Sequence, residues 1–153
     1  MKKITLPLIA ALVIAADQLT KYMVRSSMQP GDRIPVIGDW LSIYYVQNTG
    51  TAFSMFAGNR FVTLFLPSVL IIACLVFIVR ELRESHFITP LLLTLVAAGG
   101  ISNIIDRLTL GFVTDMISCG SFAVFNVADI FVTCGCILTM IAVVVMYKDE
   151  EEA

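Results

Sequence analysis

The sequence predicts a mainly α-helical membrane protein with four transmembrane helices, a small extracytoplasmic β-sheet and an interfacial helix. Of its 153 residues, 58% are hydrophobic and only 14% are charged, and the mean hydropathy is +0.90. These values are far from those of a soluble domain. We expect a single domain over residues 1–153, and the net charge of -2 offers no basic surface to a nucleic acid.

Four segments are long and apolar enough to cross a bilayer, which requires about 20 apolar residues in a helix. We expect spans at about 4–24, 61–79, 87–105 and 127–147, with extracytoplasmic loops at 25–60 and 106–126. The first span contains Asp17 and Lys21, whose i,i+4 spacing lets them pair on one helical face. This pairing makes both charges tolerable inside the membrane.

The N-terminal segment also has an alternative interpretation as a cleavable signal peptide. Lys2 and Lys3 precede an apolar stretch that ends near Ala15, as they do in such peptides. Apolar residues continue as far as Val24, however, and this favours a complete spanning helix. The Lys and Arg residues of the short loops divide evenly between the two sides, so only Lys2 and Lys3 favour cytoplasmic termini.

The alternating direction of the spans predicts that most polar residues gather on one side of the membrane. The end of the first span, the start of the second, the end of the third and the start of the fourth all share that side. The residues placed there are Asp17, the loop 25–60, Asn103, Asp106, Arg107, Asp115, Asn126 and Asp129. Acids at a bilayer boundary mark a candidate functional site, because their desolvation is unfavourable.

The first polar loop is expected to contain regular structure. Residues 31–35 have turn composition, and residues 40–46 are rich in strand-forming side chains. Residues 47–56 begin with turn chemistry and continue with an amphipathic pattern suited to a helix at the interface. Asn48 is therefore either a turn residue or a site residue.

The second polar loop is predicted to form a β-hairpin with strands at 111–118 and 122–126. Pairing about Gly120 would set Asp115 opposite Phe125 and bring it near Asn126 and Asp129. A slip of one residue would turn Asp115 to the other face of the sheet, so its orientation depends on the register.

The available side chains restrict the chemistry of this cluster. A serine or cysteine hydrolase needs a base, and the single histidine, His86, is predicted on the opposite side of the bilayer. No zinc-binding motif is present, and we expect neither a metal nor a cofactor. Asp115 and Asp129 remain. Two close carboxylates share a proton, so one can deprotonate water while the other hydrogen-bonds a carbonyl, as in aspartic proteases.

Two other classes of function fit the residues less well than an acid-catalysed hydrolase does. A proton channel or transporter would need polar groups throughout the bilayer, and the inner halves of the spans have almost none. A non-catalytic scaffold would leave the acid pair unexplained.

Three of the four cysteines, including Cys134 and Cys136, lie in apolar segments and are interpreted as small packing residues rather than metal ligands.

Five sequence blocks together resemble the lipoprotein signal peptidases, also called signal peptidase II. The resemblance covers essentially the whole chain in order and spacing. The blocks are Asp17-Gln18-Leu19-Thr20-Lys21, Asn48-Thr49-Gly50-Thr51-Ala52-Phe53, Gly99-Gly100-Ile101-Ser102-Asn103-Ile104-Ile105-Asp106-Arg107, Val113-Thr114-Asp115 and Phe125-Asn126-Val127-Ala128-Asp129. Many members carry glycine where this chain has Ser102, which we expect to be a packing residue.

The resemblance implies an aspartic endopeptidase of the bacterial inner membrane. Such enzymes cut prolipoproteins just before a diacylglyceryl-modified cysteine, near the outer surface, and are blocked by the cyclic peptide globomycin. It implies a catalytic dyad of Asp115 and Asp129. It also implies a set of residues that bind substrate or support the dyad: Asp17, Lys21, Asn48, Gly50, Asn103, Asp106, Arg107 and Asn126. We expect a monomer among membrane lipids, with no nucleic-acid partner.

Two pairs in this set keep alternative roles. Asp106 and Arg107 could form an internal salt bridge that supports the third span, or they could contact substrate. Asp17 and Lys21 are better explained as structural support than as participants in the chemistry.

Overall fold

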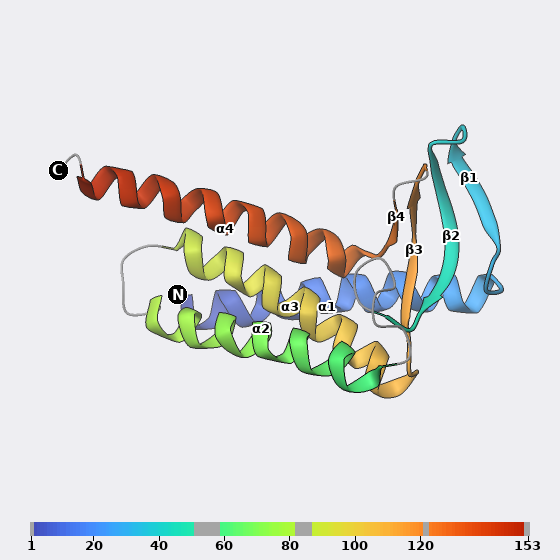
Figure 1. Ribbon diagram of the computed structural model, residues 1–153, viewed down its shortest axis with the longest axis horizontal. Helices are drawn as coiled ribbons and strands as arrows, with labels where there is room; N and C mark the ends of the chain where they lie inside the picture. Colours follow the sequence, from blue (N-terminus) through green and yellow to red (C-terminus); the bar gives the residue numbers. More distant parts are fainter. Residues whose placement is uncertain (1, 51–58, 82–86, 121–122, 152–153) are drawn as a thin grey trace.

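Four helices and a four-stranded sheet make up the fold of the computed structural model, which describes residues 2–50, 59–81, 87–120 and 123–151. The helices are α1 (Lys2–Ser27), α2 (Arg60–Glu81), α3 (Ile88–Thr109) and α4 (Val127–Glu151). They lie side by side, with both chain termini at one end and the sheet across the other (Figure 1). Candidate spans at Ile4–Ser27, Phe61–Glu81, Ile88–Thr109 and Val127–Val145 confirm the four predicted spanning helices.

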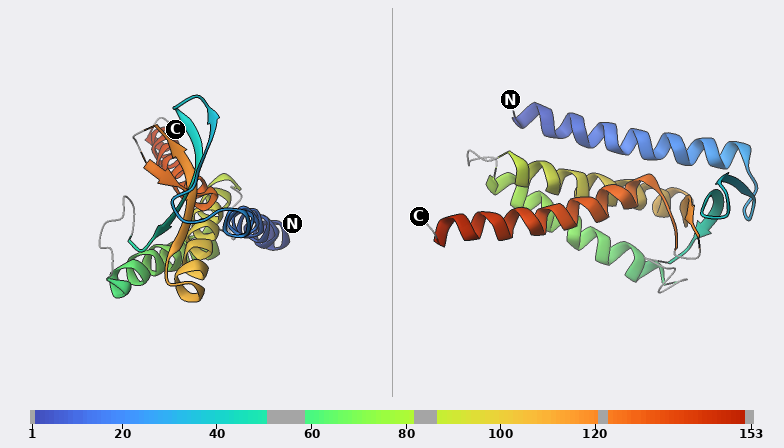
Figure 2. Two further views of the ribbon diagram at one scale, coloured as in Figure 1. Left: turned by 90° about the vertical axis from the view of Figure 1, so that its right-hand side faces the viewer. Right: turned by 90° about the horizontal axis from the view of Figure 1, so that it is seen from above.

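The sheet is antiparallel, with its strands in the order β1-β2-β3-β4. Its strands are β1 (Arg33–Ile37), β2 (Leu41–Asn48), β3 (Val113–Cys119) and β4 (Ala123–Phe125). The first two strands come from the loop between α1 and α2, and the last two from the loop between α3 and α4. The strands run across the ends of the helices (Figure 2), so both polar loops meet above one end of the bundle.

The structure confirms the predicted strand at 40–46, as β2, but corrects two other predictions about the loops. The turn expected at 31–35 is wrong beyond Asp32, because Arg33–Ile37 pairs with β2 as an edge strand. Pro35 fits there, since an edge strand tolerates a residue without an N–H donor. The hairpin register is also wrong, since Ile117 rather than Asp115 lies opposite Phe125. The shift of two residues leaves Asp115 on its predicted face.

Some predicted features fall outside the described residues. The interfacial helix expected within 47–56 falls largely in residues 51–58, and only its first residues, at the end of β2 and just after it, are described. His86 also lies outside the described part of the chain.

Glycines bring α3 against its neighbours, as small residues do between membrane helices. A Cβ on Gly99 would lie 2.6 Å from the Ala128 carbonyl oxygen of α4, and a Cβ on Gly135 would lie 2.6 Å from a methyl group of Val96. Gly99 therefore permits a close approach of α3 and α4. It brings the first turn of α4 next to the end of α3 that carries the polar residues.

Candidate active site

A cavity of about 560 Å³ lies where the sheet meets the ends of α3 and α4. Polar side chains from β2, α3, β3 and α4 reach it, alongside an apolar wall. The charged and amide residues that line it are Asn48, Asn103, Arg107, Asp115 and Asp129, and the hydroxyl residue Thr133 lines it as well. The structure thus brings both predicted catalytic carboxylates to one cavity.

Asn126 joins the two carboxylates. It precedes α4 directly, so its side-chain oxygen accepts the Asp129 N–H at 3.0 Å, while Asp129 accepts the Asn126 N–H at 3.1 Å. This reciprocal arrangement is a capping box, which satisfies two N–H groups at the start of a helix. The Asn126 amide nitrogen then donates to Asp115 at 2.7 Å. One residue therefore caps α4 and holds Asp115 beside the helix that carries Asp129.

Three asparagines point their NH₂ groups at the dyad because their oxygens are already engaged by donors. Asn48 accepts the Gly50 N–H at 2.9 Å and donates to Asp115 at 2.9 Å. Asn103 accepts from Lys21 at 2.7 Å and donates to Asp129 at 2.8 Å. Asn126 has the same arrangement. Asn48 is thus both the turn residue and the site residue that the sequence left open.

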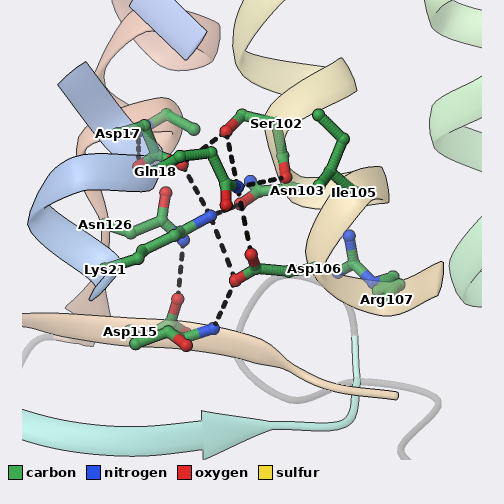
Figure 3. Close-up of polar contacts among 12 residues, drawn as sticks. Asp17, Gln18, Lys21, Ser102, Asn103, Ile105, Asp106, Arg107, Asp115 and Asn126 are labelled. Atoms are coloured by element: carbon green, nitrogen blue, oxygen red, sulfur yellow. Dashed lines mark hydrogen bonds and ion pairs between the residues drawn. The ribbon is translucent and has the colours of Figure 1, made fainter. Parts of the chain in front are cut away.

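Lys21 lies at the centre of a buried polar network between α1 and α3 (Figure 3). Its side chain is fully buried, and its ammonium group lies 2.7 Å from Asp17, 2.7 Å from Asn103 and 3.4 Å from Asp106. The i,i+4 pair predicted from the sequence is therefore present. A lysine ammonium has three N–H donors, and three partners surround this one.

The two acids of this network reach the backbone next to Asp115 and Asp129. Asp17 accepts the N–H of Ala128 at 2.8 Å, immediately before Asp129. Asp106 accepts the N–H of Thr114 at 3.0 Å, immediately before Asp115. The network therefore holds the backbone immediately before both Asp115 and Asp129.

Asp106 and Arg107 do not pair with each other in the described part of the chain. Asp106 faces Lys21 and, at 3.8 Å, Arg25. Arg107 turns to the cavity and donates to the Gly50 carbonyl at 2.9 Å, while its buried Nε has no hydrogen-bond partner among the described residues. Neighbours in sequence thus separate into a supporting acid and a cavity-lining cation.

Burial raises the pKa of Asp115 to about 6. Hydrogen bonds from Asn48 and Asn126 and the charge of Lys21 act in the opposite direction, whereas the nearby Asp129 carboxylate adds to the increase. The residue Asp115 is only 2% exposed, so its charged form loses most of its hydration. Asp115 is consequently suited to hold a proton in the mildly acidic range.

Sequence reasoning missed several members of the network. Gln18 donates to Ser102 and Asp106 at 3.0 Å each, and Arg25 donates to Thr114 at 3.0 Å. Ser102 was expected to be a packing residue, but its hydroxyl donates to Asp17 at 2.7 Å. The spacing of positions 17, 18, 21 and 25 on one face of α1 was the signal that could have found them.

The fold and the cavity together define a class: an integral membrane protein of four spans with a carboxylate pair suited to acid–base chemistry at one end of its bundle. Comparison with known proteins identifies the family. Residues 9–145 match the family described as signal peptidase (SPase) II. The chain belongs to this family, and it cleaves signal peptides from prolipoproteins.

Individual relatives and structures agree with this assignment. A lipoprotein signal peptidase of Streptococcus agalactiae serotype Ia is 34% identical over 98% of this chain and 96% of its own. One from Moorella thermoacetica is 37% identical over 86% and 87%. A solved structure described as a bacterial membrane enzyme is 30% identical and covers 97% of this chain and 93% of its own, with a TM-score of 0.86.

Proposed function

We propose that Asp115 and Asp129 form the catalytic dyad with which this chain cleaves prolipoproteins. The observation that carries the proposal is the hydrogen-bonded unit of Asp115, Asn126 and Asp129 on one cavity wall. One ionised carboxylate removes a proton from water, and the other, protonated, donates a hydrogen bond to the scissile carbonyl oxygen. The apparent pKa values then belong to the pair.

The balance of charge supports a single proton on the dyad. Four carboxylates and three cations meet at this end of the bundle within the described residues. They are Asp17, Asp106, Asp115 and Asp129, with Lys21, Arg25 and Arg107. One shared proton makes the cluster neutral, and a neutral cluster has the smallest desolvation penalty at a membrane boundary.

The remaining site residues divide into two roles under this proposal. Asn48, Asn103 and Asn126 keep amide donors on the carboxylates. Arg107, held by the Gly50 carbonyl, lines the cavity and binds the substrate backbone. A second group supports the dyad through ion pairs with the buried Lys21. Its members are Asp17, Lys21 and Asp106.

The substrate proposed is a prolipoprotein whose cysteine carries a diacylglyceryl group, with cleavage just before that cysteine. We place the dyad at the outer surface of the bacterial cytoplasmic membrane, with both termini in the cytoplasm, since Lys2 and Lys3 favour a cytoplasmic N-terminus and the spans are even in number. We further propose that the chain acts as a monomer and that globomycin-type peptides occupy the same cavity.

The test is cleavage of a purified diacylglyceryl prolipoprotein by the purified protein in lipid nanodiscs. Asp115→Asn and Asp129→Asn should each abolish release of the signal peptide. Asp39→Asn is the matched control, because Asp39 is exposed in the turn between β1 and β2. Full cleavage by either dyad variant would refute the proposed mechanism.

A further inference from the structure

The cavity continues from the dyad along the apolar wall of α4. Ile130, Val132 and Thr133 line it beyond Asp129. Thr133 is four residues after Asp129, so the two share a helical face, and it lies about 6 Å farther along the axis. Helix α4 begins at the sheet and runs away from it along the bundle (Figure 1). Thr133 follows Asp129 in α4, so it is on the bilayer side of Asp129.

Thr133 differs from the other hydroxyl residues of the spans. A serine or threonine in a membrane helix normally donates to the carbonyl one turn earlier. Ser68, Thr94 and Thr139 do so at 2.8, 2.6 and 2.7 Å. Among the serine and threonine side chains described in the four helices, only that of Thr133 has no hydrogen-bond partner.

Under the proposed function, the substrate backbone offers hydrogen-bond acceptors to the Thr133 hydroxyl. A peptide bond can reach the dyad only where the signal peptide has left its helical conformation. At membrane depth each backbone group released from the helix is unfavourable unless it finds another partner. The segment on the N-terminal side of the scissile bond lies deeper in the bilayer, which is the side of the cavity where Thr133 lies.

We propose that the Thr133 hydroxyl donates a hydrogen bond to a substrate backbone carbonyl on the N-terminal side of the scissile bond. This inference rests on the proposed function. An extended chain advances about 3.3 Å per residue, so a 6 Å offset corresponds to about two residues upstream of the cut. Thr133 is then a substrate-binding residue that holds the unwound segment within the membrane.

The experiment compares three variants in the nanodisc cleavage assay. Thr133→Val keeps the shape and removes the hydroxyl, and Thr133→Ser keeps the hydroxyl. Thr139→Val is the matched control, because Thr139 donates only to the Gly135 carbonyl of its own helix. One typical net hydrogen bond corresponds to a loss of roughly 3- to 10-fold in kcat/KM for Thr133→Val. The thermal midpoint should not change, Thr133→Ser should stay near wild type, and so should Thr139→Val.

A substrate analogue identifies the acceptor. Replacing the peptide bond two residues upstream of the cut by an ester weakens its carbonyl as an acceptor. The loss caused by Thr133→Val should then become smaller, as expected for two partners of one interaction.

Several outcomes would overturn the inference. These are a Thr133→Val variant as active as wild type, a Thr133→Ser variant as impaired as Thr133→Val, an equal loss in Thr139→Val, or an undiminished loss with the ester substrate. Wild-type cleavage is measured first. Its absence would count against the proposed function, whereas its presence with a neutral Thr133→Val would count only against the role of Thr133.

Discussion

Replacing Lys21 by methionine tests the buried network most directly. Methionine has a similar length and fills the space, but it removes the ammonium group that contacts Asp17, Asn103 and Asp106. Asp17 and Asp106 would keep their hydrogen bonds from Ser102, Ala128, Gln18 and Thr114, yet they would lose their shared counter-charge.

The expected magnitude follows from the burial of these groups. The side chains of Lys21, Asp17 and Asp106 are no more than 1% exposed. Removing one partner of a buried ion pair typically destabilises a protein by about 3–5 kcal/mol. A double variant, Lys21→Met with Asp17→Asn, also removes one of the unpaired negative charges. It should therefore recover part of the loss.

Denaturant-induced unfolding in detergent micelles measures these differences, with wild type and both variants followed under one condition. The reasoning would be refuted if Lys21→Met unfolded within about 1 kcal/mol of wild type, which is the size of an exposed ion pair. A double variant less stable than Lys21→Met would also contradict it, because relief of the unpaired charge is the source of the expected recovery.

Three further predictions concern helix packing, proton binding and metals. Gly99→Ala should lower the thermal midpoint and the activity, because its Cβ would meet the Ala128 carbonyl at 2.6 Å. Gly100→Ala should lower both by a smaller amount, because its Cβ would meet only a flexible side chain at 3.0 Å. Equal thermal midpoints of the two variants would contradict this prediction. In a profile of kcat/KM against pH, activity should decline as the pH rises through about 6, where Asp115 loses its proton. Asn48→Ala removes a hydrogen bond that lowers the pKa of Asp115, so this variant should show the decline at higher pH. A shift to lower pH would contradict the assignment. Folding raises the pKa of Asp115 from 3.8 to about 6, so the protonated form of Asp115 stabilises the folded state. This stabilisation is complete below pH 3.8 and is lost as the pH rises to about 6, so the unfolding midpoint should fall between these two pH values. Cleavage should persist in a chelator, since amide N–H groups already donate to all four oxygens of the two carboxylates, and loss of activity restored by a divalent cation would refute this.

The grouping of the polar residues could be predicted from the sequence because it depends only on span count and chain direction. The pairing of Asp17 with Lys21 followed from helix geometry in the same way. The contact of Lys21 with Asn103 could not be predicted, because it depends on how α1 is rotated against α3. Single-sequence periodicity does not determine that rotation when both helices are apolar on most of their surface.

The sheet shows a different limit. The turn-forming residues near Gly31 and Pro35 predict a turn, so β1 could not be predicted from the sequence. This strand forms because it pairs with β2 through backbone hydrogen bonds. Glycine 120 has a φ of 55°, so a turn there was correctly expected, but the pairing of Ile117 with Phe125 depends on tertiary contacts of the loop. Asp115 kept its predicted face because the error was an even number of residues.

The capping box of α4 has a consequence for the assembly of the protein in the membrane. Asn126 and Asp129 lie at the start of α4, which the ribosome delivers after α1, α2 and α3. Asp129 reaches its hydrogen-bonded position only when the first turn of α4 has formed against α3. Before that helix inserts, the nascent chain carries one carboxylate of the proposed pair and no partner for it. Under the proposed mechanism, proteolytic competence therefore begins only when α4 has packed against α3.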